Sequence, residues 1–280
     1  MIFRHQDQQC DLSRRTLIIG IINVTPDSFS DGGKYLKCEA AIARGLELVG
    51  QGADVLDIGG ESTRPGAEPV PAEEEIRRVV PVIEGIRHQS AVAISVDTYK
   101  ADVAAAAIQA GASIVNDISG FQLDAQIPEV VRRSGAGIIL MHMQGTPRTM
   151  QKNPRYADVV HEVKNHLRER IEFALASGID RDRIMIDPGI GFGKTMEHNL
   201  QLLQGLPSFK SLDRPILVGT SRKSFITKTV GESVESRDWG TAATVAYCIR
   251  QGAHAVRVHN AQLCQEVARM TDAVVHGISM

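Results

Sequence analysis

The sequence lacks several features on which common protein classes depend. Its four cysteines are widely spaced and form no Cys-x-x-Cys pair, which excludes the usual zinc-ribbon and dithiol redox patterns and is typical of a reducing compartment. The 31 Lys and Arg nearly balance the 33 Asp and Glu, for a net charge of -2. A chain without an excess of one sign is not expected to bind nucleic acid or an anionic membrane surface.

Long hydrophobic runs are also absent. The first fifteen residues are polar and charged where a secretory signal is apolar, and runs such as 17–19 are much shorter than the roughly 20 residues that span a bilayer. We therefore expect a cytoplasmic protein with no membrane partner. A chain of 280 residues is long enough to bury roughly 70 to 75% of its unfolded surface, so its core needs no disulfides.

Eight short runs rich in Ile and Val recur along the chain, and each predicts a strand buried on both faces. They cover residues 17–22, 55–58, 92–96, 113–115, 137–141, 184–186, 215–218 and 255–258. Segments with helical apolar spacing lie between them, for example 40–49, 76–86, 101–110 and 159–176. Glycine comes just before a strand at 52, 111, 135, 178 and 252, a repeated signal for the end of a helix.

This repeated strand-and-helix unit predicts an α/β protein, a (β/α)8 TIM barrel. We expect one domain over residues 1–280, with residues 1–15 as a short N-terminal extension. The alternative, a doubly wound sheet, typically has five to seven strands and often a glycine fingerprint after its first strand.

Polar residues follow nearly every predicted strand. The active sites of such barrels form at the carboxyl ends of the strands, where these residues fall. One polar residue there can simply cap the next helix, but burying so many around one axis is costly unless a polar ligand satisfies them. They are Asn23, Asp57, Asp97, Asn116, Asp117, His142, Asp187, Ser221 to Ser224, Arg257 and His259.

The cations Arg222, Lys223 and Arg257 cluster with His259 at the last two strands, where barrels of this kind most often bind phosphate. An anionic substrate group is therefore expected. The alternative is that Arg222 is a surface charge and Arg257 pairs with a carboxylate of the barrel. Two long loops, 23–33 and 59–67, are rich in hydroxyls, glycines and acids and are candidate lids.

Three familiar motifs are incomplete. The run 187–195 resembles a phosphate-binding P-loop, but Pro188 stands where that motif needs glycine. His161 and His166 are five residues apart, about 140° around a helix, which does not suit a zinc helix. Ser221 and Ser224 lack the G-x-S-x-G pattern of serine hydrolases.

Taken together, eight segments resemble the dihydropteroate synthases, which belong to the pterin-binding enzymes. They are NVTPDSFSDGG at 23–33, DIGGESTRPG at 57–66, SVDT at 95–98, NDI at 116–118, MHM at 141–143, DPGIGFGK at 187–194, SRKS at 221–224 and RVH at 257–259. The resemblance spans nearly the whole chain in the order of the family. It implies a transferase of folate biosynthesis that joins 6-hydroxymethyl-7,8-dihydropterin pyrophosphate to 4-aminobenzoate, releases pyrophosphate, uses Mg²⁺ and forms a homodimer. Members of the family are sulfonamide targets.

The resemblance also implies roles for individual residues. Asp97, Asn116, Asp187 and Lys223 would bind the pterin, since a carboxylate can accept two parallel hydrogen bonds from an aminopyrimidinone edge. The pyrophosphate would meet Arg257, His259, Thr63 and, through Mg²⁺, Asn23; Asp31 would order the first loop or the departing anion. The predicted contacts to the aminobenzoate and the remaining substrate atoms are Arg64, Pro65, Phe29, Phe192, Ser224, Met143 and Val258.

One position departs from the family's common pattern. Many members have Asp after the Arg-x-His segment, whereas this chain has Asn260. Asparagine keeps the hydrogen-bonding carbonyl and loses the charge, so no acid role is assigned there.

Three other functions stay open at this point. A pterin-dependent methyltransferase would share the pterin-binding carboxylates but would not need the cation cluster of the last two strands. An aldolase-type barrel would use Lys223 to form a Schiff base. A non-catalytic pterin-binding protein would bind the ring and show no turnover.

Overall fold

The computed structural model of the chain describes residues 1–25 and 34–277, and it is a closed eight-stranded parallel barrel. The strands are hydrogen-bonded in the order β8-β7-β6-β5-β4-β3-β10-β9, and a parallel bridge between Ile186 and Ile216 joins the two ends. Their bounds are Leu17–Asn23 (β3), Val55–Gly59 (β4), Ala93–Asp97 (β5), Ile114–Asp117 (β6), Gly137–Met141 (β7), Ile184–Asp187 (β8), Leu217–Val218 (β9) and Ala255–Val258 (β10). All eight predicted strands are confirmed, and so is the (β/α)8 fold.

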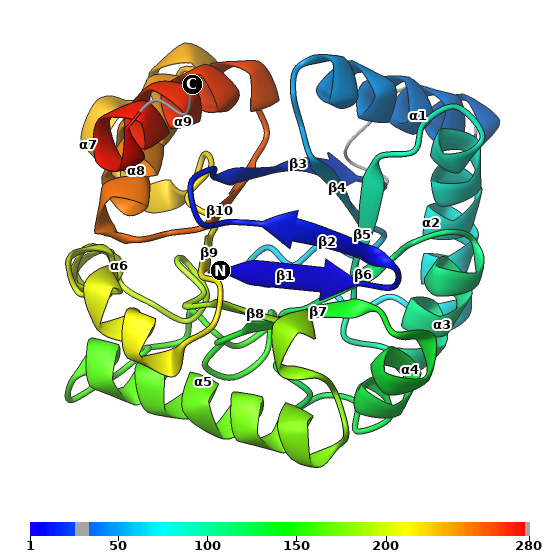
Figure 1. Ribbon diagram of the computed structural model, residues 1–280, viewed down its shortest axis with the longest axis horizontal. Coiled ribbons are helices and arrows are strands. Elements are labelled where there is room, and N and C mark those ends of the chain that lie inside the picture. Colours follow the sequence, from blue (N-terminus) through cyan, green and yellow to red (C-terminus); the bar gives the residue numbers. More distant parts are fainter. Residues whose placement is uncertain (26–33, 278–280) are drawn as a thin grey trace.

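Helices surround the barrel and connect its strands (Figure 1). They are Lys34–Gly50 (α1), Ala72–Arg87 (α2), Ala101–Gln109 (α3), Ile127–Ser134 (α4), Val159–Ala176 (α5), Met196–Gln204 (α6), Ser224–Val230 (α7), Val234–Gln251 (α8) and Ala261–His276 (α9), with short 3-10 helices at Arg181–Arg183 (η2) and Leu206–Leu212 (η3). The five glycines predicted to end helices all have positive φ, and Gly135 and Gly252 close α4 and α8 in the left-handed conformation. That signal in the sequence is therefore confirmed.

Side chains alternate between the inside of the barrel and the layer of helices around it, as the pleat of a strand requires. On β3, Leu17 and Ile19 belong to the inner cluster, whereas Ile18 and Ile22 belong to the outer one. The inner cluster is apolar and fills the amino-terminal half of the barrel. Its further members include Val55, Ala93, Ile114, Ile139, Met185, Leu217 and Ala255.

An antiparallel hairpin closes the amino-terminal end of the barrel. It consists of β1 (Ile2–His5) and β2 (Gln8–Asp11), and Figure 1 shows it lying across the middle of the ring of helices. Phe3 is completely buried, and it joins Leu12 in the inner cluster. The segment predicted as a short extension is therefore a folded plug, which polar composition alone did not indicate.

Candidate functional site

The carboxyl-terminal half of the barrel contains polar side chains in place of the apolar cluster. Alternation along the strands directs Asp57, Ser95, Asn116, Asp187 and Arg257 inward at the levels above Val55, Ala93, Ile114, Met185 and Ala255. Asp57 is completely buried, and the carboxylates of Asp97 and Asp187 are almost so. The predicted gathering of polar residues at the strand ends is therefore present.

Arg257 on β10 connects these residues across the barrel. Its Nε donates to Asp57 Oδ2 at 2.5 Å, and its Nη2 donates to Asp97 Oδ2 at 2.7 Å. Asn116 donates from Nδ2 to the same oxygen of Asp57 at 3.1 Å. Arg257 is thus paired with carboxylates of the barrel, which was the alternative to an anion contact in the sequence analysis. Its Nη1 has no hydrogen bond to any residue that the structure describes.

Three polar atoms in this region have no hydrogen-bond partner among the described residues although they are buried: Oδ1 of Asp57, Oδ1 of Asp97 and Oγ of Ser95. Buried acceptors without partners are costly. Asp97 can therefore accept a bond from a ligand N–H through Oδ1 while Oδ2 stays paired with Arg257.

Burial and the neighbouring charges set the protonation of this network. Burial raises the pKa of Asp97 to about 7, with Arg257 opposing the rise and Asp57 adding to it. Burial lowers the pKa of Arg257, but Asp57 and Asp97 outweigh it and raise that pKa above its ordinary value. Arg257 is therefore always charged, whereas Asp97 changes its charge near neutral pH.

Lys223 provides a second cation near Arg257, because it follows β9, the strand that pairs with β10. Its Nζ donates to the carbonyl of Ile190 and lies 4.7 Å from the centre of the Phe192 ring. Burial lowers the pKa of Lys223 to about 8, although Asp187 opposes this shift. Lys223 and Asp187, predicted as partners in one site, are thus electrostatically coupled.

The glycine-rich run after β8 is a compact turn against β7. Asp187 Oδ1 accepts from the amide of Gly189 at 2.7 Å, and Gly189 has φ of +69°. A Cβ at that position would lie 1.9 Å from the carbonyl oxygen of His142, so only glycine fits. Lys194 is buried and binds the carbonyl of Phe192 at 2.9 Å. Its Nζ thus points back into the turn, unlike that of a P-loop lysine.

His259 follows β10 and is fixed by Ser221. The Ser221 hydroxyl accepts from the amide of His259 at 3.1 Å and lies 2.9 Å from Nδ1 of the same residue. Burial, together with the charges of Arg257 and Arg222, lowers the pKa of His259 to about 3. The ring is therefore neutral, and a bond from Ser221 to Nδ1 would leave a proton on Nε2 for donation to an anion.

Arg222 is occupied by an ion pair outside the barrel. It forms a two-point bond to Asp238, Nε to Oδ1 at 2.7 Å and Nη2 to Oδ2 at 2.9 Å. Asn260 donates to the same carboxylate at 3.0 Å and accepts from the amide of Leu263, which caps α9. An aspartate at 260 could form that cap but would place a second negative charge against Asp238, so the amide suits this chain.

The remaining predicted site residues lie around the mouth of the barrel. In the loop after β4, Thr63 is half-buried, whereas Arg64 and Pro65 are exposed, and Ser224 is exposed at the start of α7. Met143 is buried in a small cluster that Phe192 contacts. Phe29 and Asp31 lie outside the described residues.

The side chain of Val258 lies outside the interior of the barrel. It is 1% exposed and belongs to the outer cluster between the strands and the helices. Because Arg257 points into the barrel, its neighbour on the strand points out. The side chain of Val258 therefore faces the helices, and the predicted contact of this residue with substrate stays a prediction.

Asn23 is the one residue predicted to bind a metal. It is half-buried at the end of β3, and alternation directs it inward. In the described part of the chain, no group of three or more His, Cys, Asp or Glu is arranged to hold a metal ion. A single amide oxygen fits Mg²⁺ that is bound mainly by phosphates and water, and it does not fit a permanent metal centre.

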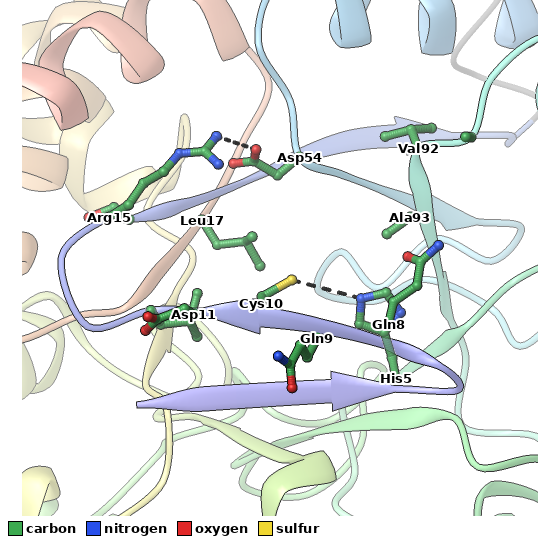
Figure 2. Close-up of a pocket in the computed structure, with 13 residues that line it drawn as sticks. His5, Gln8, Gln9, Cys10, Asp11, Arg15, Leu17, Asp54, Val92 and Ala93 are labelled. Atoms are coloured by element: carbon green, nitrogen blue, oxygen red, sulfur yellow. Dashed lines mark hydrogen bonds and ion pairs between the residues drawn. The ribbon is translucent and has the colours of Figure 1, made fainter.

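A cavity of about 390 Å³ lies at the other end of the barrel, between the hairpin and the strands. Figure 2 shows Cys10 and His5 facing each other there, with Sγ 3.8 Å from Nε2, and Arg15 paired with Asp54. None of the predicted site residues lines this cavity, so the polar half of the barrel remains the candidate site.

Sequence reasoning gave no role to two residues that organise the site, Asp57 and Ser221. Asp57 binds both Arg257 and Asn116, and Ser221 fixes the ring of His259. The signal for Asp57 was its place at a strand end, two residues before the predicted second loop. Its partners could not be read from the sequence because they lie 59 and 200 residues away.

Comparison with known proteins gives a consistent result. The model of the family described as "Pterin binding enzyme" matches residues 19–259. The curated dihydropteroate synthase of Synechocystis is 44% identical over 265 residues, which cover 94% of this chain and 92% of that protein.

Solved structures agree. A Xanthomonas albilineans dihydropteroate synthase with 4-aminobenzoic acid superposes with a TM-score of 0.91 at 44% identity, covering 98% of this chain and 97% of that one. The enzyme of that organism in complex with 7,8-dihydropteroate gives 0.87 at 41% identity, covering 98% of each chain. None of the described helices is long and apolar enough to cross a membrane.

Proposed function

Because the chain belongs to the pterin-binding enzyme family, we propose how its barrel residues carry out dihydropteroate synthesis. The chain is a transferase that condenses 6-hydroxymethyl-7,8-dihydropterin pyrophosphate with 4-aminobenzoate and releases pyrophosphate. The observation that carries the assignment of roles is the buried Asn116–Asp57–Arg257–Asp97 network with its free acceptor atoms.

The pterin binds in the polar half of the barrel, with its ring against Asp97, Asn116, Asp187 and Lys223. The pterin presents N–H donors along one edge, and Oδ1 of Asp97 is an acceptor that is already buried and has no partner among the described residues. Arg257 favours the ionised form of Asp97, which is the form that accepts these bonds. The network therefore prepares the carboxylate before the ligand arrives.

The leaving pyrophosphate lies toward His259 at the mouth of the barrel. His259 donates from Nε2, Thr63 from its hydroxyl and Arg257 from Nη1, which has no partner among the described residues. Donors therefore meet the oxygens on which charge develops. Asn23 would hold Mg²⁺ through its amide oxygen, and the ion would add positive charge near the leaving group. Holding the ring and the leaving group in place is the main catalytic contribution, because the reaction needs no covalent nucleophile on the protein.

The aminobenzoate binds between Phe192, the loop bearing Arg64 and Pro65, and Ser224 at the start of α7. Arg64 and Ser224 are exposed and can reach its carboxylate, while the ring of Phe192 forms an apolar wall. Lys223 lies over that ring, which supports adjacent pockets for the pterin and the aminobenzoate.

We also propose a cytoplasmic homodimer. Exposed apolar side chains gather on α7, α8 and α9, namely Val230, Val234, Trp239, Met270 and Val274, of which Trp239 is 60% and Val274 73% exposed. Large exposed apolar groups on neighbouring helices are typical of a protein interface. Cys10, Cys38, Cys248 and Cys264 are all free, which suits a reducing compartment.

The activity is tested by incubating the purified protein with the pterin pyrophosphate, 4-aminobenzoate and Mg²⁺. We expect dihydropteroate and pyrophosphate in equal amounts, and none when 4-aminobenzoate is omitted. A Lys223→Met variant should lose most of this turnover. Equal product formation with and without protein would reject the function.

A further inference from the structure

Glu61 lies at the start of the loop between β4 and α2, and its carboxylate bonds to the far end of the same loop. Its Oε2 accepts from the amide of Val70 at 2.8 Å, across nine residues of the chain. The residues between them, 62–69, include Thr63, Arg64 and Pro65. One buried carboxylate therefore joins the two ends of the segment that carries three predicted substrate contacts.

Two other side chains hold the Glu61 carboxylate in place. The hydroxyl of Tyr99 donates to Oε1 at 2.6 Å, and Nζ of Lys100 donates to Oε2 at 2.5 Å. Lys100 donates equally to Glu75 on α2, whose carboxylate is 1% exposed. Both oxygens of Glu61 are thus bound by groups of the rigid β5–α3 connection, and the loop cannot move away without breaking buried, charge-assisted bonds.

The backbone just before Glu61 is also fixed. Arg78 donates from Nη1 to the carbonyl of Gly60 at 2.8 Å. A Cβ on Gly60 would lie 2.8 Å from Val79 and 2.9 Å from Glu75, so the chain passes directly against α2. Glu61 therefore leaves the barrel at a set position and in a set direction.

The tip of the loop has much weaker attachments. Gly66 donates to the carbonyl of Pro147 at 3.2 Å, and the exposed side chains of Glu68 and Arg148 are 3.4 Å apart. An exposed ion pair contributes little to stability. The position of Arg64 and Pro65 over the barrel therefore depends mainly on the hydrogen bonds at the base of the loop.

We propose that Glu61 is a positioning residue for 4-aminobenzoate, which acts by closing the β4–α2 loop on Val70 and so placing Arg64 and Pro65. The inference rests on the proposed function, because it takes these two residues as contacts to that substrate. Glu61 itself does not touch substrate; Lys100 and Tyr99 act one step further away by holding Glu61.

The test compares Glu61→Ala, Glu61→Gln and Glu73→Ala, a control at an exposed acid in the first turn of α2. Glu61→Ala should raise KM for 4-aminobenzoate tenfold or more. The fall in kcat should stay within threefold, because Thr63 in the same segment is only one of three donors to the pyrophosphate. Glu61→Gln keeps an oxygen for Val70 and loses the charge, so its KM should rise three- to fivefold. Glu73→Ala should match the parent.

Binding of 6-hydroxymethylpterin, which lacks pyrophosphate, separates this role from a general structural one. Its affinity depends on the barrel and should stay within twofold in all three variants. Weakened pterin binding in Glu61→Ala, or a fall in kcat with unchanged KM, would overturn the proposal. If Glu61→Ala does not fold, Glu61→Gln decides by itself, and an unchanged KM would overturn the proposal.

Hydrogen–deuterium exchange provides a readout that does not depend on turnover. The amides of residues 62–69 should exchange faster in Glu61→Ala than in the parent, and those of the barrel strands should not change. An inactive parent would reject the proposed function, whereas unchanged exchange in this segment would reject the closure by Glu61.

Discussion

Asp57 lies so close to Asp97 that the guanidinium of Arg257 bonds to both carboxylates, at 2.5 and 2.7 Å. Two buried acids therefore share one cation, and the negative charge of Asp57 makes ionisation of Asp97 harder. Replacing either partner of a buried ion pair leaves the other charge uncompensated. Asp57 thus affects the pKa of Asp97, the residue that we expect to bind the pterin. The oxygen of Asp57 that is paired with Arg257 does not contact the ligand.

The first prediction concerns the pH dependence of pterin binding. The ionised form of Asp97 accepts the hydrogen bonds, so affinity should fall as pH falls through the pKa of about 7. Burial is the main cause of this raised pKa and the charge of Asp57 adds to it, so Asp57→Asn should move the fall to lower pH. Calorimetric titration with 6-hydroxymethylpterin between pH 5.5 and 8 measures it. Ser95→Ala, which removes no charge, should leave the curve in place, and a curve for Asp57→Asn identical to that of the parent would contradict the account.

The second prediction concerns the N-terminal hairpin. Phe3 is completely buried at the base of the barrel, so Phe3→Ala should lower the free energy of unfolding by about 3–5 kcal/mol. Ile2→Ala, at a 44% exposed position, should change it by less than about 1 kcal/mol. Urea denaturation measures both. A loss for Phe3→Ala no larger than that of Ile2→Ala would show that the hairpin does not stabilise the barrel.

The third prediction concerns the turn after β8. Gly189→Ala introduces a Cβ 1.9 Å from a backbone oxygen at positive φ, so the turn must shift. Gly231 also has positive φ but has no atom within 4 Å of an added Cβ. Gly231→Ala should cost about 1 kcal/mol from backbone strain alone. We expect a larger loss of stability in Gly189→Ala, together with weaker pterin binding; equal losses would contradict this prediction.

The fourth prediction concerns stability in acid. Burial lowers the pKa of His254 to about 4, and its Nδ1 accepts from the amide of Ile216 at 3.2 Å. The unfolded chain therefore binds a proton near the ordinary histidine pKa of 6.5, whereas the folded chain does not bind it until about pH 4. Stability should fall as pH drops through this interval.

His254→Asn keeps an acceptor for Ile216 and removes the titration. The unfolding midpoint in urea should then depend less on pH between 7 and 5 than in the parent. His88→Asn, at an exposed position, provides the control. An equally steep pH dependence in His254→Asn and the parent would contradict the role given to burial.

The barrel strands could be predicted from the sequence because burial on both faces of a parallel strand leaves an unbroken apolar run. The runs at 17–22 and 137–141 show this clearly, and both became strands. The hairpin at residues 2–11 could not be predicted in this way, because only Phe3 and His5 are buried in a polar segment. Short antiparallel strands of this kind depend on the surface they cover.

The site residues were predictable by position and not by partner. Asp97, Asn116 and Asp187 follow strands, and strand ends meet at one face of a barrel. The pairing of Arg257 with Asp57 depends on three-dimensional closure across the barrel, and the sequence left it open against an anion contact. The motif at 257–259 did not show that the side chains of Arg257 and Val258 point to opposite faces of the strand, which follows from the pleat.

The central claim is that the polar half of the barrel binds the pterin through its carboxylates, and Asp187→Asn tests it most directly. Equilibrium titration with 6-hydroxymethylpterin should show about 30-fold weaker binding than in the parent, since a hydrogen bond to a charged group contributes about 1.5–3 kcal/mol. Asp102→Asn, at an exposed position on α3, should bind as the parent does. Parent-like affinity in a folded Asp187→Asn protein would contradict the account.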